Sequence, residues 1–134
     1  MPLTADRDTA AREGSSVGHP VKAASKIYAG ALVCLDANGW AVPGATATTL
    51  KAVGRAESQA DNTAGANGDL TVTCKRGLFR FKNSATDAIA RSHIGGTAYV
   101  EDDETVAATH GGNTRSAAGK IIDLDAAGVW VEIR

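Results

Sequence analysis

The stretch LTVTCKRGLFRFK, residues 70–82, alternates apolar and polar side chains almost without interruption. A period of two places successive side chains on opposite faces of an extended strand. We therefore expect Leu70, Val72 and Cys74 to face one side of a sheet, with the intervening Thr and Lys side chains facing the other. This pattern commits the stretch to strands rather than to a helix.

Shorter runs of the same kind recur from residue 21 onward, separated by clusters of Gly, Asn, Asp, Ser and Thr. Short strands joined by glycine-rich turns are typical of small barrels and sandwiches. We therefore predict a mainly β fold, a small β-barrel or sandwich, with one short helix and an extended N-terminal arm. The further strands are expected at residues 30–35, 40–44, 50–57, 97–101, 120–124 and 129–133.

The predicted helix lies within residues 84–94. Ser84 or Thr86 is suited to cap its N-terminus, Asp87 complements the first turn, and Gly95 ends it. We expect one or two helical turns here.

The N-terminal residues 1–20 differ from the rest because their only large apolar side chains are Met1, Leu3 and Val17. So little apolar surface does not offset the entropy of ordering the segment alone. We assign residues 1–20 to an extended arm and residues 21–134 to one β-rich domain. The arm is either a mobile tail or a segment that orders on a partner. Its candidate partner-binding residues are Leu3, Asp6, Arg7, Arg12 and Val17.

Two nearly identical phrases, LDANGW and LDAAGVW, occur near the two ends of the β region. In each, an Asp (Asp36 or Asp125) is expected to cap backbone N–H groups, and a Gly (Gly39 or Gly128) to adopt a positive φ. A type I turn followed by a Gly bulge joins antiparallel strands. We interpret the phrases as structural turns.

Composition limits the core and the classes of partner. Alanine supplies 26 of the apolar residues, whereas a domain of this size buries roughly two thirds of its unfolded surface. A lone subunit should therefore be modestly stable, which favours burial against other subunits or a partner. The net charge is −1, whereas DNA-binding domains typically carry an excess of Lys and Arg. Residues 74–82 come closest, and either a nucleic-acid surface or an ordinary strand pair fits them.

Cys34 and Cys74 lie inside apolar stretches, so we expect buried free thiols, with a disulfide as the alternative that depends on geometry. No apolar run approaches the ~18–20 residues of a membrane span. No cofactor or metal site is expected: the acidic residues 101–104 fit a solvated turn, and the three His stand far apart. Without a phosphate loop or a nucleophile–base pair, we do not expect an enzyme.

The order of motifs in residues 26–134 resembles that of a known family. GALVCLDANGW, AVGRAE, LTVTCKRGLFRF, DAIARSHIGGTAYV and AAGKIIDLDAAGVWVEI follow one another in the chain. This order is similar to that of the capsid cement or decoration proteins of bacteriophages, short head proteins of which some are labelled as recombinases. The resemblance covers about four fifths of the chain. The longer arm and the loops at residues 46–49 and 109–118 depart from it.

The resemblance implies a structural virion protein that binds the outside of the assembled head and stabilises contacts between major capsid protein subunits. It implies a homotrimer on the capsid surface. From the residues themselves we expect synthesis in the host cytoplasm, no small-molecule substrate and, because of the near-neutral charge, no nucleic-acid partner. Two alternatives stay open: a nucleic-acid-binding phage protein, matching the recombinase label, and a tail or baseplate β-module.

Overall fold

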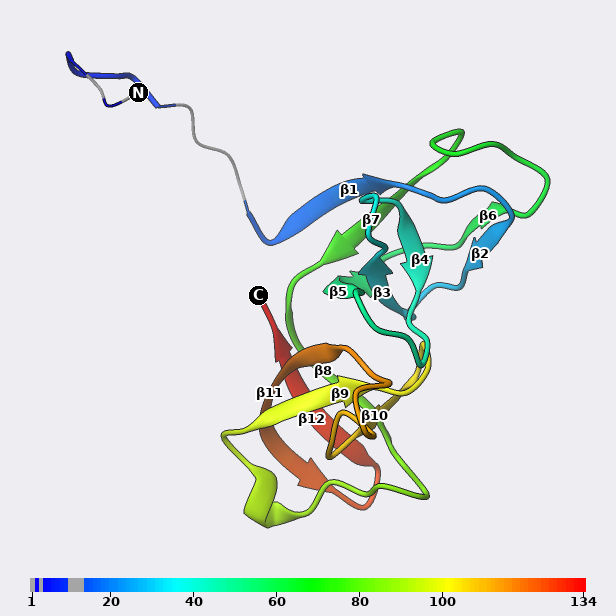
Figure 1. The fold of residues 1–134 in the computed structure, drawn as a ribbon, viewed down its shortest axis with the longest axis vertical. Coiled ribbons are helices and arrows are strands. Elements are labelled where there is room, and N and C mark those ends of the chain that lie inside the picture. The colour runs from blue at the N-terminus through cyan, green and yellow to red at the C-terminus, as the bar shows by residue number, and fades with distance from the viewer. Residues whose placement is uncertain (1, 3, 10–13) are drawn as a thin grey trace.

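The molecule consists of two stacked halves whose regular secondary structure is almost entirely β-strand (Figure 1). The computed structural model describes residues 2, 4–9 and 14–134. The N-terminal half is a five-stranded sheet with a small two-stranded ladder, and the C-terminal half is a closed five-stranded barrel. The predicted mainly β fold is therefore confirmed.

The sheet of the N-terminal half has the strand order β1-β7-β5-β3-β4, and all its neighbours are antiparallel. Just after β1, Val21 bridges Ala41 in parallel, and Lys22 N donates a hydrogen bond to Ala41 O at 3.0 Å. The chain leaving β1 thus reaches the opposite end of the sheet and curls it. The strands are β1 (Ser16–Pro20), β3 (Leu32–Leu35), β4 (Ala41–Pro43), β5 (Lys51–Ala56) and β7 (Thr71–Lys75), with β2 (Ser25–Ile27) and β6 (Ala60–Asn62) in the ladder.

The barrel of the C-terminal half closes in the order β10-β8-β12-β11-β9. Only β10 and β8 pair in parallel, and the other neighbours are antiparallel. Closure removes the free strand edges that an open sheet leaves. The strands are β8 (Gly77–Asn83), β9 (Thr97–Val100), β10 (Thr105–Ala107), β11 (Ala117–Asp125) and β12 (Gly128–Ile133).

Strand β3 connects two hydrophobic cores. Leu32 and Cys34 pack with the barrel residues, whereas Val33 packs in the core of the N-terminal half. Successive side chains of a strand point to opposite faces, so one strand supplies both cores. The continuous apolar run of β3, in place of clean alternation, is the signature of burial on both faces.

No α-helix forms at residues 84–94, which corrects the helical part of the prediction. The only helical element there is a 3₁₀ turn, η1 (Arg91–His93). Ser84 Oγ does accept the N–H groups of Asp87 and Thr86, as a helix cap would. However, the side chain of Asn83 bonds both the N–H and the C=O of Ile89. These bonds hold an irregular segment, because burial of Ile89 in the barrel core outweighs the local helical signal.

The first Asp–Gly phrase forms the turn between β3 and β4. Asp36 Oδ1 accepts the N–H groups of Asn38 at 2.9 Å and Trp40 at 3.0 Å. Gly39 has φ +87° and donates its N–H to Asp36 O at 3.0 Å. This geometry is the capped type I turn with a Gly bulge that the sequence predicts.

The second phrase forms the turn between β11 and β12. Asp125 Oδ1 accepts the N–H groups of Ala127 at 2.8 Å and Gly128 at 3.2 Å. Gly128 has φ +154°, and a Cβ placed on it would lie 2.4 Å from Phe81 O of the neighbouring β8. Glycine is required here by the close approach of a strand as well as by the turn.

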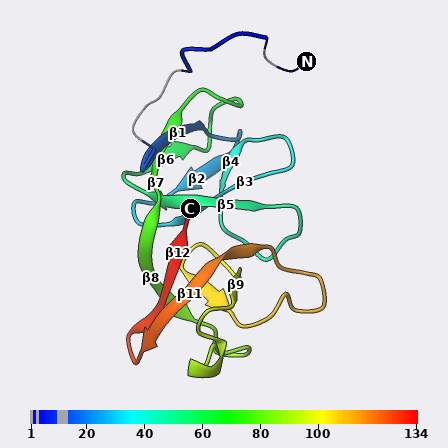
Figure 2. The ribbon, with the colours of Figure 1, turned by 90° about the vertical axis from the view of Figure 1, so that its left-hand side faces the viewer.

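The boundary of the arm lies earlier than residue 20. Residues 16–20 form β1 and pair with β7 from Ser16 opposite Lys75 to Pro20 opposite Thr71. The N-terminal segment outside the sheet is therefore residues 1–15, which we call the arm from here on. Its described residues 4–9 lie beyond the sheet end of the molecule, opposite the barrel (Figures 1 and 2).

Both cysteines are buried free thiols. Burial, and then the nearby Cys74, raise the pKa of Cys34 to about 12. Burial, and then the charge of Glu57, raise the pKa of Cys74 to about 11. Because thiolates are the reactive form, these thiols behave as small hydrophobic side chains rather than as nucleophiles.

Candidate interaction surface

Strand β1 is the terminal strand of the five-stranded sheet. Its pairing with β7 is bounded by hydrogen bonds from Arg76 N to Ser15 O at 2.7 Å and from Val21 N to Leu70 O at 2.9 Å. In an antiparallel pair, hydrogen-bonded and non-hydrogen-bonded residue pairs alternate. The backbone groups of Ser16 and Gly18 therefore point away from β7, and an exposed edge of this kind can receive another strand.

The proposed partner-binding residues that the structure describes do not form one cluster. Leu3 and Arg12 lie outside the described residues. Asp6 and Arg7 are exposed in the arm. Val17 belongs to β1, directly opposite the buried Cys74, and is half-buried on the core side of the sheet.

His19 shares the core side of β1 with Val17. It lies opposite Val72 and is half-buried. Burial, and then the positive charge of Arg76, lower the pKa of His19. The imidazole is therefore favoured in its neutral form as part of the sheet packing.

The basic stretch at residues 74–82 places its two aromatic rings inward. Phe81 is buried in the barrel core, and Phe79 is half-buried with the guanidinium of Arg55 lying 4.5 Å from its ring centroid. Lys82 Nζ lies 2.8 Å from Glu104 Oε1. The predicted alternation of this strand is confirmed, whereas Leu70, which precedes β7, is 40% exposed rather than core-facing.

Arg55, where the two halves of the molecule meet, was not identified from the sequence as a functional candidate, whereas Arg80 belongs to the 74–82 stretch that was considered as a nucleic-acid surface. Arg55 lies on Phe79, and Arg80 lies 5.8 Å from the ring centroid of Trp130 on β12. These contacts join residues up to 50 positions apart in the chain, which no local pattern reveals. The cations of the 74–82 stretch and the Trp after the second turn were the only available signals.

The loop at residues 46–49 fastens the two halves together. Thr46 Oγ1 donates to Glu101 O at 2.7 Å, and Ser116 Oγ donates to Ala47 O at 2.7 Å. Glu101 and Ser116 both lie in loops of the barrel. This loop departs from the pattern of the family that the sequence resembles, and in this chain it has a structural role.

The loop at residues 109–118 is anchored by Arg115, whose side chain is only 13% exposed. Its guanidinium donates to Asp87 Oδ2 at 2.8 Å and lies 3.7 Å from Glu101 Oε1. The same Glu101 oxygen accepts the hydroxyl of Ser84 at 2.6 Å. Arg115 Nε is buried without a hydrogen-bond partner among the described residues. The paired charges hold the loop against the segment that was predicted to be helical.

The acidic residues 101–104 are committed to structural contacts. Glu101 joins the Arg115 network and Glu104 pairs with Lys82. Burial, and then the carboxylate of Asp102, raise the pKa of Asp103. Across residues 2, 4–9 and 14–134, no group of three metal-ligating side chains converges.

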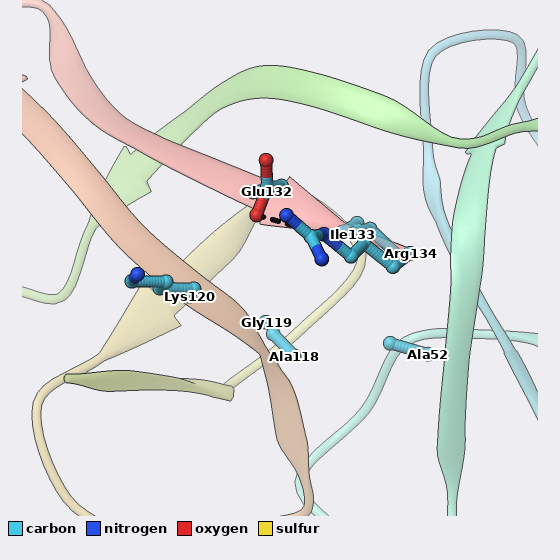
Figure 3. Close-up of a pocket in the computed structure, with 7 residues that line it drawn as sticks. All are labelled: Ala52, Ala118, Gly119, Lys120, Glu132, Ile133 and Arg134. Atoms are coloured by element: carbon cyan, nitrogen blue, oxygen red, sulfur yellow. Dashed lines mark hydrogen bonds and ion pairs between the residues drawn. The ribbon is translucent and has the colours of Figure 1, made fainter. Parts of the chain in front are cut away.

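A hollow of about 370 Å³ lies where the barrel strands β11 and β12 face β5 (Figure 3). Arg134 Nε donates to Glu132 Oε1 at 3.1 Å, and Lys120 points away from this pair. The residues that line it carry no side-chain nucleophile beside a base. We therefore interpret the hollow as part of the boundary between the two halves and not as a catalytic site.

Comparison of the chain with models of known protein families, with curated proteins and with solved structures finds no match. Within the described part of the chain, no helix has both the length and the apolar character needed to cross a membrane.

Proposed function

We propose that this chain is a structural virion protein that binds the outside of an assembled bacteriophage head and stabilises contacts between major capsid protein subunits. The order of its strand, turn and glycine motifs resembles that of capsid cement or decoration proteins. The fold that this resemblance leads one to expect, a small β body, is the fold observed.

The observation that best supports the proposal is the position of β1. The arm leads into β1, the edge strand of the sheet, where the backbone groups of Ser16 and Gly18 point away from β7 and are available to a partner strand. Strand addition gives affinity through main-chain hydrogen bonds. A protein that binds the assembled shell, and not free subunits, stabilises the shell by mass action at every equivalent site.

Contact between copies on the shell is part of the proposal. The core is rich in small side chains, whereas four large apolar side chains are exposed among the residues that the structure describes. Such side chains are available for burial between subunits. We propose a trimer on the capsid surface, where three copies contact one another and the subunits beneath them. The four exposed residues are Tyr28, Leu70, Leu78 and Ile122.

The alternative function is binding of nucleic acid through residues 74–82. Sequence-tolerant binding of single strands uses aromatic faces on which bases stack. Phe81 is buried and Arg55 covers Phe79, so these rings are engaged within the protein. Lys82 is already paired with a carboxylate. These contacts favour the structural role.

Electron microscopy of particles assembled with and without the chain tests the proposal. We expect extra density on the outer surface of the head, absent when the gene is deleted, and lower thermal stability of the deleted particles. Density on the tail or baseplate would show instead that the protein is a tail or baseplate β-module. Salt-sensitive binding of single-stranded DNA in a gel-shift assay, without density on the particle, would favour the nucleic-acid role.

A further inference from the structure

A second hollow lies between the two halves, and we call it the waist groove. Its volume is about 300 Å³, at the lower end of the range for ligand-binding clefts. Arg55 and Arg80 lie over the rings of Phe79 and Trp130. A guanidinium stacked on a ring keeps its N–H edge available to an anion. The lining residues are Gly30, Arg55, Leu78, Phe79, Arg80, Phe81 and Trp130.

Positive charge is in excess at the waist groove and beside it, where Lys75 neighbours the lining residue Arg55. Lys75 lies directly opposite Arg55 in the β5–β7 pair, and like charges in this position repel. Glu57 neutralises only Arg55, at 2.8 Å. Among the described residues, no carboxylate lies within 4 Å of the charged groups of Lys75 or Arg80. An anionic segment bound here would relieve the repulsion.

The groove also has an apolar side. Leu78, two residues before Arg80 on β8, is 47% exposed. A partner segment with small apolar residues next to its acidic groups would cover this side chain. The groove therefore suits a short peptide better than a bare anion.

The arm has this chemistry. Its described residues 4–9 read Thr-Ala-Asp-Arg-Asp-Thr, and their hydrogen bonding stays within the arm, where Thr9 N donates to Arg7 O at 3.0 Å. In an extended chain, residues two apart face the same way. Asp6 and Asp8 would then form one acidic face, with Arg7 on the other.

We propose that the waist groove of one copy binds the arm of a second copy, with Asp6 and Asp8 facing Arg80 and Lys75. Figures 1 and 2 place the described arm residues beyond the sheet end, away from the waist between the two halves. A fully extended arm of 15 residues spans up to about 50 Å, enough to cross to a neighbouring molecule. The opposite face, with Arg7, stays available to the shell, and the contact between copies does not itself require a shell.

Analytical ultracentrifugation of the full chain, from micromolar to near-millimolar concentration, tests this contact. We expect concentration-dependent association that weakens with added salt. The exposed Arg80→Glu change and, separately, a variant carrying Asp6→Lys and Asp8→Lys should each raise the dissociation constant at least tenfold, about 1.4 kcal/mol. Adding Lys75→Glu to these three changes should restore association to within about threefold of the original chain, because the charges on both sides of the contact are then exchanged.

Arg91→Glu is the matched control, because Arg91 is 74% exposed on η1 and lies outside the groove. It should leave association unchanged, and circular dichroism should show the same β fold in every variant. The proposal would be overturned if the protein stayed monomeric over the whole concentration range. It would also be overturned if the combined charge reversals did not restore association. The proposal would also be overturned if the chain did not self-associate but bound a single-stranded oligonucleotide, and if Arg80→Glu abolished that binding. None of these results depends on the head-binding experiment.

Discussion

At the scale of single residues, the two turn glycines face different constraints although their sequences look alike. At Gly39, a Cβ would meet nothing within 4 Å, so only the positive φ opposes a side chain. We expect Gly39→Ala to cost about 1 kcal/mol and Gly39→Asn less, since Asn tolerates this region. Gly128→Ala should cost about 3 kcal/mol or more because the Cβ would clash with Phe81 O.

Urea unfolding of these variants measures the difference, with Ala37→Ser as the exposed control in the first turn. The Asp-x-x-Gly spacing was sufficient to predict both turns, because capping and positive φ are local properties. The clash behind Gly128 was not predictable, since Phe81 reaches it only through the pairing of β8 with β12. Equal free energies of unfolding for Gly39→Ala and Gly128→Ala would contradict this distinction.

A second residue-scale prediction concerns pH and Asp87. The hydroxyl of Thr109, and also the guanidinium of Arg115, hold the pKa of Asp87 below its usual value. A lowered folded-state pKa stabilises the fold above the unfolded value of about 3.9, and this stabilisation is lost as the pH falls through the folded value. Asp87→Asn should therefore flatten the loss of stability below about pH 5, and Thr109→Val should flatten it partly.

Thermal unfolding followed by circular dichroism across this pH range makes the measurement. Asp87→Asn should also lower stability at neutral pH, because Arg115 then loses its charged partner in a largely buried site. A variant as stable as the original at pH 7, with the same acid dependence, would show that the Arg115 network does not hold the loop.

At the scale of elements, the new boundary of the arm changes how a truncation should behave. Deleting residues 1–14 should leave the β fold and its unfolding midpoint nearly unchanged, because every strand remains. It should weaken head binding at least tenfold, about 1.4 kcal/mol. Deleting residues 1–20 removes β1 and uncovers Val72 and Cys74, so we expect marked destabilisation.

The comparison uses urea unfolding and co-sedimentation with heads that lack the protein. Loss of the fold on deleting residues 1–14 would mean that the arm contributes to the body. Unchanged head binding by this variant would place the shell contact on the sheet and barrel alone.

The strands were predictable to very different degrees. β7, β8 and β12 alternate clearly, and their burial follows that alternation, with Val129, Val131 and Ile133 inside. β1 carries the small and polar residues of an arm, and it becomes a strand only because β7 lies beside it. The helical pattern at residues 84–94 failed for the same reason: contacts distant in the sequence decide segments whose local preference is weak.

At the scale of the whole molecule, the division into two halves was not visible in the sequence. The strand runs indicated a barrel or sandwich, but pairing order depends on contacts between distant residues. The chain achieves two small cores with few large side chains by using β3 in both. It also pins the loop at residues 46–49 of one half to Ser116 of the other. These links predict that neither half is independently stable.

The two tryptophans test this coupling because each reports on one half: Trp40 precedes β4, and Trp130 lies in β12. In variants that retain only one of them, Trp40→Phe and Trp130→Phe, fluorescence should give the same urea midpoint, as a cooperative unit requires. Leu32→Ala, which removes a fully buried side chain of β3, should lower the free energy of unfolding by about 2–5 kcal/mol in both reporters. Leu70→Ala, at an exposed position, should change it by less than about 0.5 kcal/mol. Two separate midpoints, or a Leu32→Ala effect confined to one tryptophan, would show that the halves fold independently and that β3 does not couple them.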